Sequence, residues 1–106
     1  MDFDKLFPLV DPSGKYNFKD CINLKEFLQK CIGIYFSALS LEDERLRNSC
    51  LAVYMAFRDH YPEYMEYLKQ EQKEKLDLVL TEVPPKVIKL RRIVIGSLAK
   101  ALKEVA

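Results

Sequence analysis

Residues 18–39 read FKDCINLKEFLQKCIGIYFSAL, and residues 40–59 read SLEDERLRNSCLAVYMAFRD. Placed at helical steps of about 100°, most apolar side chains of the first stretch share one arc of about 160°. They are Cys21, Leu24, Phe27, Leu28, Cys31, Ile32, Ile34, Tyr35, Ala38 and Leu39. Phe18, Ile22 and Phe36 widen this arc. A helix with so broad an apolar face is expected to contact neighbours on more than one side.

Polar caps mark where the first two helices begin. Asn17 followed three residues later by Asp20 resembles a capping box, which predicts that the first quoted stretch is a helix. Ser40 followed by Asp43 repeats the pattern and predicts a second helix over about 41–59. In this second helix the apolar residues at helical spacing are Leu46, Cys50, Val53, Tyr54 and Phe57, while Arg45, Asn48 and Arg58 are expected to face water.

A proline starts the next predicted helix. Pro62 suits a first helical turn, where its missing N–H costs nothing, and it predicts a third helix over about 62–81. The polar run 69–75 allows either a solvated middle turn or a break. The Glu71 and Lys75 pair, one turn apart, favours continuity.

Pro84 and Pro85 end the third helix and start a fourth over about 85–105. Residues 1–17 form an N-terminal arm and a turn, the turn being the DPSG sequence at 11–14. No segment alternates apolar and polar residues as a strand would. The predicted class is therefore all-α, with four antiparallel helices.

Composition limits the chain to one domain. Its 106 residues are 49% hydrophobic and 31% charged, which predicts a single folded domain over 1–106 rather than a disordered or membrane protein. Three cysteines, Cys21, Cys31 and Cys50, show no C-x-x-C spacing and lie in apolar stretches, so they are interpreted as small core residues. There is no signal-peptide pattern and no apolar run long enough for a membrane span. We expect a cytoplasmic protein in a reducing environment.

A shift of 44 residues brings similar residues together along the chain. It superimposes Leu46 and Arg47 on Leu90 and Arg91. The stretch 42–54, EDERLRNSCLAVY, resembles the second helix of a HEAT repeat, with an acidic turn, an aliphatic-Arg pair and then small and apolar residues. The resemblance implies antiparallel helix pairs stacked side by side, a scaffold that binds other proteins along one face. Two such repeats or a plain four-helix bundle both fit the predicted helices.

Catalytic, metal and cofactor sites lack the residues they require. His60 is the single histidine, which excludes Cys/His zinc clusters, a Ser-His-Asp triad and di-iron bundles by ligand count. The three glycines form no phosphate-binding motif. The acidic residues of 62–81 lie among lysines and are interpreted as a solvated face. We therefore expect no enzyme activity, no metal and no cofactor.

Two features point to partner binding. Tyr61, Tyr64 and Tyr67 form a ladder that is expected to anchor a partner or to complete a core that lacks Trp. On the fourth helix a basic face consists of Lys86, Lys89, Arg92, Lys100 and Lys103. Residues 84–106 carry six basic and one acidic side chain, whereas 62–83 carry three basic and six acidic ones. The basic face is expected either to bind a partner or to be an ordinary solvated face with the acidic third helix as its neighbour.

These observations predict a non-enzymatic interaction module, a protein-protein scaffold or an assembly subunit. The alternative is a small helical nucleic-acid-binding protein that uses the basic face, although a net charge of +1 is low for that class. A third hypothesis is a homo-oligomer whose interface is the apolar arc of the first helix.

Overall fold

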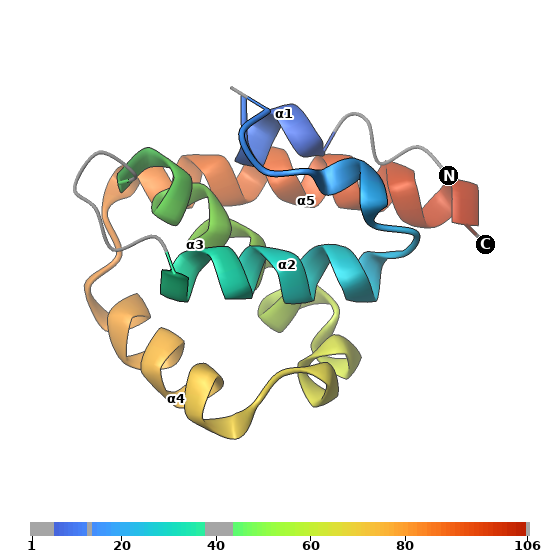
Figure 1. Ribbon diagram of the computed structural model, residues 1–106. Coiled ribbons are helices and arrows are strands. Elements are labelled where there is room, and N and C mark those ends of the chain that lie inside the picture. The colour runs from blue at the N-terminus through green and yellow to red at the C-terminus, as the bar shows by residue number, and fades with distance from the viewer. Residues whose placement is uncertain (1–5, 13, 38–43, 106) are drawn as a thin grey trace.

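The computed structural model describes residues 6–12, 14–37 and 44–105, with side chains given for these except Leu9 and 101–105. Its helical elements are α1 (Phe7–Val10), η1 (Phe18–Asp20), α2 (Leu24–Ser37), α3 (Glu44–His60), η3 (Pro62–Tyr67), α4 (Gln70–Val79), η4 (Leu80–Glu82) and α5 (Pro85–Val105), where η denotes a 3₁₀ turn. No strand occurs in these ranges. The all-α class is confirmed, and the order of the elements can be followed in Figure 1.

The centre of the structure is α3, which packs against α1, α2, η3 and α5 (Figure 1). Six consecutive residues of this helix, 49–54, are buried, so it is covered on every side over more than one turn. Ser49, Cys50, Ala52 and Ala56 are small, and small side chains allow neighbouring helices to approach closely. The hydrophobic core is built around this helix.

The first long helix begins later than predicted. Asn23, and not Asn17, caps it: the Glu26 backbone N–H donates to Asn23 Oδ1 at 2.9 Å, and the Ile22 N–H donates to Glu26 Oε2 at 2.8 Å. Residues 18–20 form only the turn η1, and Asn17 Nδ2 donates to Asp20 Oδ2 at 3.0 Å. The prediction of a helix from residue 18 is therefore wrong, because the box at 23–26 satisfies the free N–H groups better.

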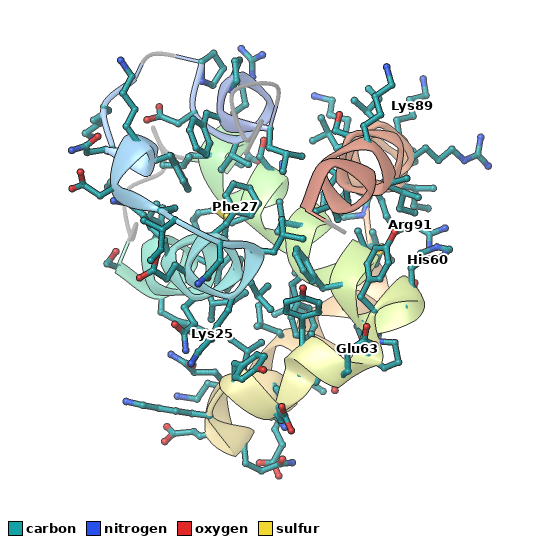
Figure 2. The ribbon with its side chains drawn as sticks, turned by 90° about the vertical axis from the view of Figure 1, so that its right-hand side faces the viewer. Lys25, Phe27, His60, Glu63, Lys89 and Arg91 are labelled. Carbon is teal, nitrogen blue, oxygen red and sulfur yellow. The ribbon has the colours of Figure 1, made fainter. Side chains whose placement is uncertain are left out.

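The segment before α2 is held by aromatic packing. Phe18 is buried, and its ring lies 5.7 Å from that of Phe7 and 5.6 Å from that of Phe27, between centroids. Figure 2 shows Phe27 between α2 and the N-terminal segment. Ile22, which was predicted to join the apolar arc, is 67% exposed because the extended backbone at Cys21 turns it outward. The remaining described members of the arc are buried, or half-buried in the case of Phe36.

The predicted third helix is interrupted. Leu68 and Lys69 are extended, with ψ of 149° and 140°, and they separate η3 from α4. Leu68 is buried by this break, and Gln29 Nε2 donates to the Tyr67 carbonyl at 3.2 Å. The Glu71–Lys75 ion pair forms at 3.0 Å but is exposed, so it contributes little against the burial of a leucine. The prediction of one continuous helix over 62–81 is therefore wrong.

Other predicted features agree with the structure. The fourth helix spans Pro85–Val105, and α3 ends one residue beyond the predicted limit. All three cysteines are buried and free, as expected. In the turn at 11–14 Gly14 has φ of +70°, which glycine adopts without steric cost. Ser13, Ala38, Leu39, Ser40 and Asp43, which several predictions named, lie outside the described residues.

Candidate functional site

The predicted basic face lies on the solvent side of α5. Lys86, Lys89, Arg92 and Lys100 are all exposed, and none forms an ion pair with a described residue. On the opposite side of the same helix Val87, Val94 and Leu98 are buried against the core. Figure 2 shows Lys89 pointing away from the body of the molecule. The side chain of Lys103 lies outside the described part of the chain.

Part of this face borders a groove of about 430 Å³ between α3 and α5. The α3/α5 groove is lined by Glu44, Arg45 and Asn48 from α3 and by Lys86, Lys89, Leu90 and Ile93 from α5. Its apolar wall is accessible, since Ile93 is 51% exposed. Only Glu44 is acidic among these lining residues. The groove thus combines an apolar wall with three cationic side chains, a combination that suits an acidic and apolar segment of a protein.

The basic face is not covered by the acidic part of the chain. The α5 helix packs on α3, and no ion pair among the described residues joins it to α4. Exposure of these side chains agrees with the expected solvated face, but none of the described ion pairs gives it the expected acidic neighbour. The reason is that the break at Leu68 directs α4 away along the edge of the molecule (Figure 1).

The tyrosine ladder is mostly part of the core. Tyr61 and Tyr64 are half-buried, and their rings lie 6.2 and 5.1 Å from the ring of Phe57. Burial raises the pKa of Tyr64. Tyr67 is 39% exposed, and the Lys25 ammonium lies 4.7 Å from its ring centroid. Figure 2 shows Glu63, beside these tyrosines, far from Lys89, so the two predicted features are separate surfaces.

A polar network joins three helices and was not predicted from the sequence. Tyr54 Oη donates to Asp77 Oδ1 at 2.6 Å, and the Arg58 guanidinium contacts both Asp77 and Asp59 at 3.1 Å. Arg91 of α5 donates to Asp59 at 2.7 Å, and Figure 2 shows Arg91 directed toward the end of α3 where His60 lies. The one available signal was the helical spacing of residues 54 and 58, which places a hydroxyl and a guanidinium on one face.

The surroundings of the network keep the Tyr54 hydroxyl protonated and neutral and the Arg58 guanidinium charged. Burial, together with the hydrogen bond to Asp77, raises the pKa of Tyr54 well above its usual range. Burial lowers the pKa of Arg58, but its bonds to Asp77 and Asp59 outweigh that effect and the net pKa is raised. The network is therefore a structural link from α4 through α3 to α5. Arg58, which was predicted to face water, is only one-third exposed because it makes these bonds.

The apolar arc of the first helix is not available for a partner. Leu24, Phe27, Leu28, Cys31 and Ile32 are buried within the chain itself. The hypothesis that this arc forms a dimer interface is therefore wrong, because α3, α1 and η1 cover it. An interface between copies would need a different surface.

The described residues include no group of three or more His, Cys, Asp or Glu side chains arranged to hold a metal ion. Burial raises the pKa of the Cys21 and Cys31 thiols, which disfavours the reactive thiolate. No helix in the described part of the chain is both long and apolar enough to cross a membrane.

Comparisons of the chain with protein-family models, curated proteins and solved structures find no match.

Proposed function

We propose that this protein is a non-enzymatic interaction module that binds an acidic, amphipathic segment of another polypeptide in the α3/α5 groove. The observation that carries the proposal is the combination, on one groove wall, of the half-exposed Ile93 with Lys86 and Lys89, neither of which forms an ion pair with a described residue. An apolar contact of this kind supplies affinity, and the surrounding cations select for acidic partners.

We further propose that the protein works in the reducing cytoplasm, since free buried cysteines are typical there.

For the helix arrangement we propose a HEAT-like relation between α3 and α5, with α2 paired to α3, while α4 departs from that pattern because it does not lie along α5 (Figure 1). It is supported by the packing of α3 on α5, the two helices that the 44-residue shift superimposes. Arg47 and Arg91, equivalent under that shift, are both half-buried with Nε atoms out of reach of described acceptors. A plain bundle would bury a full stripe of every helix, whereas Leu76 is the only buried residue described for α4.

The alternative function is binding of nucleic acid by the basic face of α5. Lys86, Lys89, Arg92 and Lys100 favour it, because all four are exposed and none is paired with an acid in the described part of the chain. The apolar wall of the groove and the net charge of +1 favour a polypeptide partner instead. The two functions differ in which lysines they need, because Lys100 belongs to the basic face but not to the groove.

The test is a titration of ¹⁵N-labelled protein with a synthetic helix in which glutamates flank two leucines placed one turn apart. We expect the shifted amides to gather around Arg45, Asn48 and Ile93. Lys89→Glu is expected to weaken binding at least about fivefold. The control Lys100→Glu makes the same charge change on the same helix outside the groove, and it is expected to change affinity less than about twofold.

A parallel titration with single- and double-stranded oligonucleotides, at about 50 and about 200 mM salt, tests the alternative. Tight binding that falls steeply with salt, and that both Lys89→Glu and Lys100→Glu weaken, would establish the nucleic-acid function. Shifts that avoid the groove residues in the peptide titration would refute the proposed polypeptide site.

A further inference from the structure

On the outward face of α4 a leucine side chain is exposed to solvent beside acidic side chains. Leu78 is 73% exposed and Val79 is 42% exposed. Helical spacing places Glu71, Glu74 and Lys75 on the same face as Leu78, seven, four and three residues before it, so acids outnumber bases there. The opposite face holds Leu76, which is fully buried and attaches the helix to the core. This outward face is itself an acidic, apolar helical segment.

The acidic and apolar side chains of this face complement the cationic and apolar lining of the α3/α5 groove. The groove supplies Arg45, Lys86 and Lys89 as cations and Leu90 and Ile93 as apolar contacts. The acids of α4 are only weakly engaged within the chain: Glu71 accepts from Lys75, 62% exposed, at 3.0 Å, and Glu74 accepts from Gln70 at 3.3 Å. Exposed pairs of this kind exchange partners at little cost.

Within one molecule the two surfaces are held apart. Asp77 joins α4 to Tyr54 and Arg58, in the C-terminal half of α3. The groove lies at the N-terminal end of α3, at Glu44, Arg45 and Asn48. Thirteen residues separate Arg45 from Arg58, which is about 20 Å along a helix. Leu78 therefore cannot enter the groove of its own chain while the Asp77 contacts persist.

We propose that the groove is filled by α4 of a second copy of this chain. Leu78 of one molecule lies against Leu90 and Ile93 of the next, while Glu71 and Glu74 face Lys86 and Lys89. This inference rests on the proposed function, since it names the occupant of the same groove. Each molecule offers one groove and one α4, so the contact is head-to-tail and produces a ring or an open chain.

Two single variants and their mixture provide the test, by sedimentation velocity over a range of protein concentrations. The unmodified protein is expected to increase in mass with concentration and to dissociate as salt is raised. Leu78→Lys removes the α4 surface, and Lys89→Glu removes the groove surface, so each alone is expected to weaken association at least about tenfold. An equimolar mixture is expected to form a heterodimer and nothing larger, because one intact groove meets one intact α4.

Two controls match these changes elsewhere on the surface. Ile22→Lys replaces a similarly exposed aliphatic residue with lysine, and Lys100→Glu repeats the charge reversal outside the groove. Both are expected to associate like the unmodified protein. If either control abolishes association as fully as its counterpart, the head-to-tail contact is refuted.

Other outcomes separate this inference from the proposed function. A chain that stays monomeric at every concentration, yet binds the synthetic acidic helix in the groove, overturns self-association and leaves the interaction module intact. Association that both variants weaken, but that mixing does not restore, indicates a symmetric contact and overturns the head-to-tail arrangement. Failure of both the peptide titration and the association experiment overturns both proposals.

Discussion

Truncation of Leu76 to alanine should release α4 while the rest of the fold stays intact. Leu76 is fully buried and is the only buried residue described for this helix. Its other described link to the core runs through Asp77, which accepts hydrogen bonds from Tyr54 at 2.6 Å and Arg58 at 3.1 Å. One buried side chain and one carboxylate therefore hold α4 on α3.

The expected cost follows from what the substitution removes. A buried Leu→Ala change costs about 2–5 kcal/mol, with the higher values where a cavity stays open. Because α4 lies at the edge of the molecule (Figure 1), it can shift into the space or detach, so we expect a loss near 2–3 kcal/mol. That loss is expected as local opening of α4 rather than as global unfolding.

Amide hydrogen exchange measured by NMR distinguishes these outcomes. In Leu76→Ala the amides of α4 should lose protection, while those of α2, α3 and α5 keep theirs. Leu78→Ala is the matched control, because the same substitution two residues away removes a 73% exposed side chain and should cost less than about 0.5 kcal/mol. Unchanged protection of α4 in Leu76→Ala, or an equal loss in Leu78→Ala, would refute the reasoning.

Three further predictions concern the core. Cys50→Leu should overpack the fully buried contact on α3 and lower the free energy of unfolding in urea by about 1–3 kcal/mol, whereas unchanged stability would mean that the site has room. Tyr54 keeps its proton in the fold above the pH at which an unfolded tyrosine loses it, so stability should fall as pH rises beyond about 10. In Tyr54→Phe that alkaline fall should be shallower, and identical pH profiles in chemical denaturation would contradict the assignment. The thiols of Cys21 and Cys31, whose pKa values are raised, should react with a disulfide reagent at neutral pH only as fast as the protein opens, and rapid modification of the native chain would show that they are accessible.

Periodicity predicted most of the secondary structure and most of the core. Apolar spacing over residues 24–35 identified side chains that are buried in the fold, and the two prolines at 84 and 85 located the start of α5. The grouping of basic residues on one face of α5 also followed from spacing alone, whereas their exposure to solvent is seen in the structure. Helix limits and the side of a helix on which a residue lies depend on neighbouring residues, so spacing along the sequence is enough to predict them.

Where two local patterns competed, the sequence did not decide between them. Both Asn17–Asp20 and Asn23–Glu26 have the spacing of a capping box, but only the Asn23 side chain accepts from a backbone N–H, and Phe18 packs with Phe7 and Phe27 instead of continuing the helix. The Glu71–Lys75 pair favoured a continuous helix, yet burial of Leu68 is worth more than an exposed ion pair. Burial depends on distant residues, so local spacing could not rank these alternatives.

Residues within a few turns of one another were enough to predict that the chain is helical, that most of the regularly spaced apolar side chains are buried and that one face of the last helix is basic. Tertiary packing, in contrast, placed α3 at the centre and joined Asp77, Arg58 and Arg91 in one network. It also brought Arg45 beside Lys89 to form the α3/α5 groove. Those features join residues that lie 19 to 44 positions apart, and their proximity is set by how helices pack, which no local pattern encodes.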